Sequence, residues 1–173
     1  MATSLYDLSV GCYLQTVGAV GGFLERGRAH FEAAGIDPDS VVGVRLFEDM
    51  APMAFQVSCV AHHSIDAVEG LRSGVFGPPT APLPKDYAGL QKVVADADAA
   101  LQALTPAEID ALAGKDVVFK LGDMQMPFTA ENFILSFSLP NFHFHATTAY
   151  DILRMKGVPL GKRNYMGRPR MKA

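Results

Sequence analysis

Four long stretches of the chain repeat apolar residues at every third or fourth position, which is the period of a helix with one buried face. The stretches cover residues 5–34, 52–72, 87–104 and 130–156. Each is long enough to span a small domain as a helix. The pattern therefore predicts a mainly helical protein whose four main helices pack around one core.

Glycine, proline and threonine mark the ends and breaks of these helices. Gly35 is placed to end the first helix, and Gly157 the last one. Thr129 can cap the last helix, and Pro140 should kink it because proline lacks a backbone N–H. Three glycines inside the first helix should need close packing against a neighbour, because glycine lowers helix propensity. They are Gly18, Gly21 and Gly22.

The connections carry local signals of their own. A turn at residues 37–40 predicts a short helix over 41–47, and the glycine- and proline-rich residues 73–84 predict a surface loop. Thr105 followed by Glu108 is a capping box that opens a short helical turn. Residues 115–128 alternate apolar and polar positions around Gly122-Asp123, which predicts a β-hairpin before the last helix.

Composition narrows the class of protein. Of 173 residues, 49% are hydrophobic and 19% are charged, so a single compact domain over 1–173 is expected, with 158–173 as a loosely attached tail. No stretch is long and apolar enough to span a bilayer, and no signal-peptide pattern is present. We therefore expect a cytoplasmic protein with no membrane partner.

Charge argues against nucleic acid as a partner, because a net charge of −3 gives no general attraction for phosphate backbones. One basic cluster lies near the end of the chain and can either meet an anion or solvate the tail. It consists of Arg154, Lys156, Lys162, Arg163, Arg168, Arg170 and Lys172.

Several polar side chains fall on otherwise apolar helix faces, where burial is costly without a partner or ligand. Asp49, Gln56 and His63 are seven residues apart around the second helix. Asn141, His145 and Thr148 follow at steps of four and three on the last helix. If the two faces meet, they form an interior polar site, whereas the neighbouring His62 and His143 should face elsewhere.

This polar site allows two interpretations. His63 and His145 can ligate a divalent metal, with Asp49, Gln56 or Asn141 completing the shell. Alternatively, they are core histidines that form hydrogen bonds across helices. Cys12 and Cys59 belong to no metal-binding spacing and are predicted to be core thiols.

Methionine and phenylalanine side chains can line an apolar pocket for a small ligand or simply fill the core. They are Met50, Met53, Met124, Met126, Phe47, Phe55, Phe128, Phe133, Phe137, Phe142 and Phe144. Phe142 and Phe144 cannot both face the interior, so one of them should pack on another element or on a second subunit. This favours a homodimer.

Several motifs together resemble a known family. They are Arg45 to Met50 with Pro52, Gln56-Val57, His63, Lys120-Leu121-Gly122, Leu139 to Phe142, Phe144 to Tyr150, Ile152 to Arg154, Gly157-Val158 and Leu160 to Arg163. The chain resembles a family of bacterial and fungal proteins that is grouped with the DinB/YfiT-like metalloenzymes. The resemblance covers nearly the whole chain and is most specific over 139–154.

The resemblance implies an up-down-down-up four-helix bundle, often dimeric, in which one histidine of the second helix and two of the last bind a divalent metal such as Zn or Ni. His63 and His145 match two of these ligands. Asn141 and Ala149 stand at the spacing of the third, so the triad is incomplete and the metal is expected to be absent. Thiol-transfer chemistry is known in some relatives.

Two functional hypotheses follow. The first is a small-molecule enzyme or binder, possessing thiol-dependent chemistry, whose site lies between the second and last helices. The second is a non-catalytic structural or interaction protein with a degenerate metal site, in which the polar cluster fixes the register of the helices.

Overall fold

The computed structural model describes residues 3–171, which form a mainly helical body with a small sheet. The long helical segments are α2 (Val10–Ala33), α3 (Met53–Ala61) continued by η2 (His62–Asp66) and α4 (Ala67–Ser73), α5 (Tyr87–Gln102), and α7 (Ala130–Phe133) continued by η3 (Ile134–Ser138) and α8 (Leu139–Met155). The shorter elements are α1 (Leu5–Leu8), η1 (Pro38–Val41), α6 (Pro106–Asp110), α9 (Lys162–Met166), and the strands β1 (Val75–Phe76), β2 (Asp116–Leu121) and β3 (Met124–Thr129).

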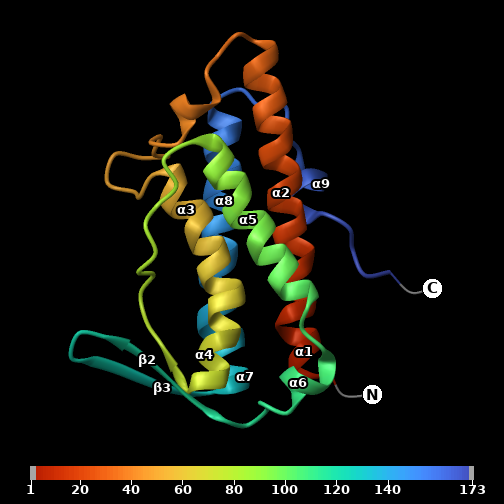
Figure 1. Ribbon diagram of the computed structural model, residues 1–173, viewed down its shortest axis with the longest axis vertical. Coiled ribbons are helices and arrows are strands. Elements are labelled where there is room, and N and C mark those ends of the chain that lie inside the picture. The colour runs from red at the N-terminus through yellow and green to blue at the C-terminus, as the bar shows by residue number, and fades with distance from the viewer. Residues whose placement is uncertain (1–2, 172–173) are drawn as a thin grey trace.

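The four long segments lie side by side (Figure 1). In that view α2 rises, α3 to α4 and α5 both descend, and α7 to α8 rises. Contacts join α2 to α5, α3 to α8, α3 to α5, and α2 to α8, so each segment has two neighbours. The mainly helical class predicted from the sequence is confirmed. No helix within residues 3–171 combines the length and the apolarity that a bilayer crossing requires.

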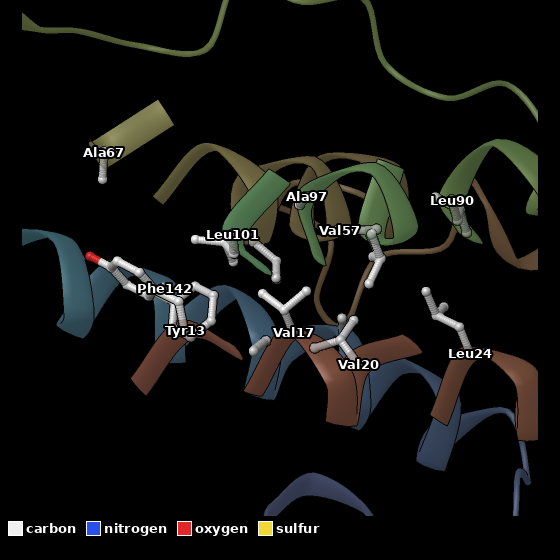
Figure 2. Close-up of a cluster of buried hydrophobic side chains, with 14 of the residues drawn as sticks. Tyr13, Val17, Val20, Leu24, Val57, Ala67, Leu90, Ala97, Leu101 and Phe142 are labelled. Carbon is white, nitrogen blue, oxygen red and sulfur yellow. The ribbon is translucent and has the colours of Figure 1, made fainter. Parts of the chain in front are cut away.

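One hydrophobic core fills the space between the segments. Figure 2 shows Val17, Val20 and Leu24 of α2 pointing toward α5, from which Leu90 and Leu101 point back. All five side chains are fully buried. The three- and four-residue repeat of apolar positions in α2 therefore marks its packed face, as its sequence predicts.

Local signals set most of the helix ends. Thr129 accepts a hydrogen bond from the backbone N–H of Asn132, and Thr105 forms its capping box with Glu108, as predicted. Gly35 and Gly157 end α2 and α8 with φ angles of 68° and 88°, a conformation that glycine adopts at little cost.

Two of the long segments contain a π-helical turn, which the sequence pattern does not reveal. η2 interrupts the second segment, and η3 interrupts the last segment directly before Pro140. Proline has no N–H for the carbonyl four residues earlier, so the π-turn takes up the break expected at this position. The first predicted helix is also broken, at Ser9, between α1 and α2.

The predicted short helix over 41–47 is wrong. Only a 3₁₀ turn forms, over Pro38–Val41, and Asp37 caps it through the N–H of Asp39. Residues 42–52 continue as turns and irregular chain, in which Gly43 and Pro52 both oppose a helix.

The sheet contains the predicted hairpin and one strand more. β2 and β3 pair antiparallel, as the alternating pattern indicates, and β1 adds to β2 in parallel, with Phe76 opposite Phe119. The sequence pattern predicts only a loop over residues 73–84, because the two residues of β1 are too few to show the alternation of a strand. The sheet brings Phe76 and Phe119 to the side of the helices.

The C-terminal segment is packed more firmly than predicted. Val158 is fully buried and Leu160 is 6% exposed, and α9 lies against α2. Gln15 of α2 donates a hydrogen bond to the carbonyl of Met166 at 2.8 Å. A loosely attached tail therefore does not describe residues 158–166, and residues 172–173 of that prediction lie outside the described residues.

The glycines of α2 differ in what surrounds them. A Cβ atom added at Gly18 or Gly22 meets nothing within 4 Å, so the prediction that these glycines need close packing is wrong. Gly27 is different, because an added Cβ would collide with the Tyr87 hydroxyl, which donates to the Leu24 carbonyl at 2.7 Å. Gly27 is thus the glycine that permits close contact between α2 and α5.

We predict opposite effects for alanine at these two positions. Gly22→Ala should raise the free energy of unfolding by about 0.5–1 kcal/mol, because alanine reduces the entropy of the unfolded chain and meets no atom. Gly27→Ala should lower it by about 1–3 kcal/mol through overpacking. Urea unfolding followed by circular dichroism measures both. Equal changes in the two variants would contradict the packing described for Gly27.

Candidate functional site

The second and last helical segments bring two predicted histidines together. His63 comes from η2 and His145 from α8, and their ring centroids are 5.7 Å apart with ring planes inclined by 13°. His63 is buried and His145 is partly buried. The two polar faces therefore meet at His63 and His145, the condition on which the predicted interior site depends.

Gln56 determines which nitrogen of His145 carries the proton. Its Nε2 donates to the Ala51 carbonyl at 2.9 Å, which leaves Oε1 to face His145 Nδ1 at 2.7 Å. Since an amide oxygen only accepts, the Nδ1 of His145 must donate. The Nε2 of His145 then holds a free lone pair, and Gln56 acts as the residue that orients this ring.

His63 has a buried polar atom without a partner. Its Nδ1 has no hydrogen-bond partner among residues 3–171 and is shielded from solvent. Burial, with smaller contributions from His62 and His145, lowers the pKa of His63 to about 3. Burial also lowers the pKa of His145 to about 4. Both rings are neutral at physiological pH, and an unpaired buried nitrogen is costly unless a ligand or water reaches the ring.

A cavity of about 260 Å³ adjoins the two histidines. Its apolar walls include Phe55, Phe76, Phe119 and Phe137. Its polar walls include His62, His63, His145 and Asn141, and Cys59 also lines it. An aromatic wall with a few polar groups is the usual composition of a small-molecule site.

Asn141 presents an acceptor at this cavity. Its Nδ2 donates to the carbonyl of Phe137 at 2.8 Å. This fixes the amide and leaves Oδ1 without a partner in the described part of the chain. Asn141 Oδ1 and the free lone pair of His145 thus provide two neutral acceptors at one site.

A buried chain of hydrogen bonds holds His63 in place. Ser138 of η3 donates to the His63 carbonyl at 2.7 Å, and the Tyr13 hydroxyl of α2 lies 2.7 Å from Ser138 Oγ. Since the serine proton is used on the carbonyl, Tyr13 is the donor to Ser138. Burial also raises the pKa of Tyr13, which keeps its hydroxyl protonated.

His62 was predicted to face away from the site, and this is wrong. It is 7% exposed, with Nδ1 at 3.0 Å from Asp66 Oδ2 and Nε2 at 2.9 Å from the Gly77 carbonyl. A π-turn has more residues per turn than an α-helix, so His62 and His63 can both face inward.

The remaining predicted residues do not reach the site. Asp49 lies exposed in the loop before α3. Thr148 is buried, but its hydroxyl donates to the Phe144 carbonyl of its own helix at 2.8 Å. His143 is exposed, as predicted, and its Nδ1 lies 3.2 Å from the Tyr165 hydroxyl.

The donor set does not fit the three-histidine metal site that the family resemblance implies. No group of three or more His, Cys, Asp or Glu side chains within residues 3–171 is placed to hold a metal ion. Cys59 lines the cavity, but burial raises the pKa of its thiol to about 12, which opposes the thiolate that a metal needs. Metal ligation by His63 and His145 alone stays a prediction.

The phenylalanines predicted to line a pocket lie in three places: the cavity, the core and the surface. Phe55 and Phe137 line the cavity, whereas Phe133 and Phe142 are fully buried core residues and Phe144 is exposed. Sequence reasoning missed Phe76, Phe119 and Cys59. The two phenylalanines reach the cavity through the pairing of β1 with β2, for which a two-residue strand gives no sequence signal.

Two comparisons place the chain among known proteins. A family model described as Domain of unknown function (DUF1993) matches residues 5–166. The crystal structure of a DinB family member protein from Shewanella denitrificans is similar with a TM-score of 0.82 and 25% sequence identity, over 98% of this chain and 95% of that chain. The search of curated proteins gave no match. The family model and the structural neighbour confirm the resemblance to a DinB-like family.

The lowered pKa values predict acid sensitivity. A histidine in the unfolded chain has a pKa of about 6.5, so it becomes protonated below that pH. His63 and His145 in the folded protein stay unprotonated there, because their pKa values are about 3 and 4. The contribution of the two histidines to the free energy of unfolding is therefore present above pH 6.5, and it is lost as the pH falls toward the folded pKa values of about 4 for His145 and about 3 for His63. Between pH 7 and pH 5 we expect a loss of roughly 2 kcal/mol for each histidine.

Urea unfolding at several pH values measures this loss. His63→Met should remove about half of it, because one desolvated histidine is gone. Ile152→Val is the control, since it weakens the core and keeps both histidines. An equally steep decline in His63→Met would contradict the assignment.

Proposed function

The chain belongs to the family of the Domain of unknown function (DUF1993), and on this basis we propose that it is a DinB-like protein that binds a small uncharged ligand at the His63–His145 cavity. The ligand would be an aromatic or otherwise apolar molecule that carries one hydrogen-bonding group. The cavity of about 260 Å³ lies just below the usual range for drug-sized ligands, so it suits a molecule of about one ring system.

The proposal includes the architecture predicted for such a protein. We infer one domain built as an up-down-down-up four-helix bundle, supported by the directions of the four long segments in Figure 1 and by their shared core. The predicted homodimer belongs to the same proposal. The exposed side chains of Phe47 and Phe144, 65% and 55% exposed, support it, because a second copy could cover them.

The observation that carries the proposal is a pair of neutral acceptors, His145 Nε2 and Asn141 Oδ1, which have no partner among residues 3–171 and belong to residues that line an aromatic cavity. If the polar cluster only fixed helix register, these two acceptors would be bonded to neighbours, as His145 Nδ1 is bonded to Gln56. A polar group left without a partner beside a cavity is instead typical of a site completed by a ligand.

The charge state of the site favours binding over proton abstraction. An effective general base has a pKa near the working pH, whereas the pKa values of His63 and His145 lie near 3 and 4. Two neutral imidazoles and the Asn141 amide recognise a ligand by hydrogen bonds without attracting ions. Thiol-dependent chemistry would need a thiol from a co-substrate, because burial raises the pKa of Cys59 to about 12.

We expect indole and phenol to bind at this cavity as minimal probes. Each has one ring system and one donor that can meet the lone pair of His145 Nε2. Nitrogen-15 NMR of the histidine side chains should show saturable shifts of His145, and His145→Phe should abolish probe binding while the protein stays folded. His143→Phe is the matched control, because this exposed histidine is on the same helix but outside the cavity.

Two results would overturn the ligand proposal. One is the absence of saturable shifts with either probe at millimolar concentration. The other is binding that His145→Phe leaves unchanged. The evidence would then favour the alternative, a structural or interaction protein in which the polar cluster fixes helix register.

The two-histidine metal site is tested separately. Elemental analysis of untagged protein, after dialysis against zinc or nickel, should find about one metal per chain if His63 and His145 form a shared site. His63→Ala and His145→Ala should each remove that metal. Metal retained by either variant would contradict a shared site.

A further inference from the structure

A second cavity lies between α2 and the C-terminal segment, and it shares no residue with the histidine site. Its volume is about 760 Å³. Figure 1 shows α9 running beside α2, so the groove follows the seam between the two helices. The chain continues from α9 across α2 through Gly167, whose φ angle is 61°.

The crossing at Gly167 is close and specific. An added Cβ there would lie 2.8 Å from the carbonyl oxygen of Gln15 and 3.2 Å from the Cβ of Ala19. Gln15 also holds the segment through its hydrogen bond to Met166. The segment thus forms a fixed wall of the groove.

The floor of the groove is open. Gly18 and Gly22 lie in it, and a Cβ at either position meets no atom within 4 Å. Each glycine costs the helix about 1 kcal/mol relative to alanine, and no packing against the chain itself explains that cost. Leu14 and Ala19 add apolar surface beside them.

The walls are strongly cationic in a chain whose net charge is −3. Arg26, Arg163, Arg168 and Arg170 line the groove, with Asp7 as the one carboxylate among its lining residues. Arg170 lies 3.8 Å from Asp7. The other three arginines have no acidic partner within 4 Å in residues 3–171.

We propose that this groove binds a small organic anion with two or more phosphate or carboxylate groups. Guanidinium groups match the paired oxygens of both groups and bind them bidentately. Arg26 from α2 and Arg163 and Arg168 from the C-terminal segment approach the groove from its two walls, so they can meet separate anionic groups of one ligand. The glycine floor leaves room for the ligand's body.

Isothermal titration calorimetry at low ionic strength tests the proposal with inorganic pyrophosphate and with citrate. We expect saturable binding of at least one of them, weakened by added salt. Arg163→Gln and Arg168→Gln should each weaken it about tenfold, the effect of losing one charge-assisted hydrogen bond. Preference for pyrophosphate would identify a phosphate ligand, and preference for citrate a carboxylate ligand.

Two controls separate a built site from general attraction. Arg28→Gln removes an arginine of the same helix that pairs with Glu32 at 2.8 Å and does not line the groove, so it should leave affinity unchanged. Gly22→Leu should block binding without unfolding the protein. Gly43→Leu, at another glycine with open space around it, should not block it.

Several outcomes would overturn the proposal. They are no saturable heat with either anion at millimolar concentration, unchanged affinity in both Arg163→Gln and Arg168→Gln, or an equal loss in Arg28→Gln. Binding that survives Gly22→Leu in the folded protein would also contradict a ligand seated on the floor of the groove.

Discussion

The hydrogen bonds that link Tyr13, Ser138 and the His63 carbonyl join three of the four long segments at one buried point. The sequence places them far apart, and each belongs to a different segment. The link lies where π-turns disturb the regular ladder of backbone bonds in both the second and the last segment. A buried carbonyl at such a turn needs a partner, and Ser138 supplies it. The position of His63, and with it the histidine cavity, depends on this link.

The same burial defines the chemistry available at the histidine cavity. Desolvation keeps His63 and His145 neutral, and Gln56 fixes the tautomer of His145. Neutral, oriented rings beside phenylalanines discriminate ligands by shape and by hydrogen bonding. The arginine-lined groove along α2 is its electrostatic opposite, because its guanidinium groups are exposed and charged. The two cavities therefore suit different classes of molecule.

Sequence reasoning recovered what depends on local period and capping. It predicted the four helical stretches, the hairpin and the cap at Thr129, and it placed His63 and His145 on the faces that meet in the structure. It failed where tertiary contacts override local pattern. The π-turn that brings His62 inward, the short strand that delivers Phe76, and the packing of α9 on α2 all depend on contacts between distant residues. Asp49 shared the heptad spacing of His63, but α3 begins only after Pro52, so Asp49 lies outside the helix and the spacing carried no information.

The π-turn at η2 also constrains how the length of this chain can vary among relatives. Such a turn holds one residue more than the α-turn it replaces, so removing a single residue would restore a regular α-helix. Because the wide turn takes up the extra residue, the side chains beyond the deletion would keep their faces, and only the residues within the turn would change direction. His62 and His63 could no longer both face inward. A one-residue gap at η2 in a relative's sequence would therefore mark a protein with a different cavity inside the same overall fold.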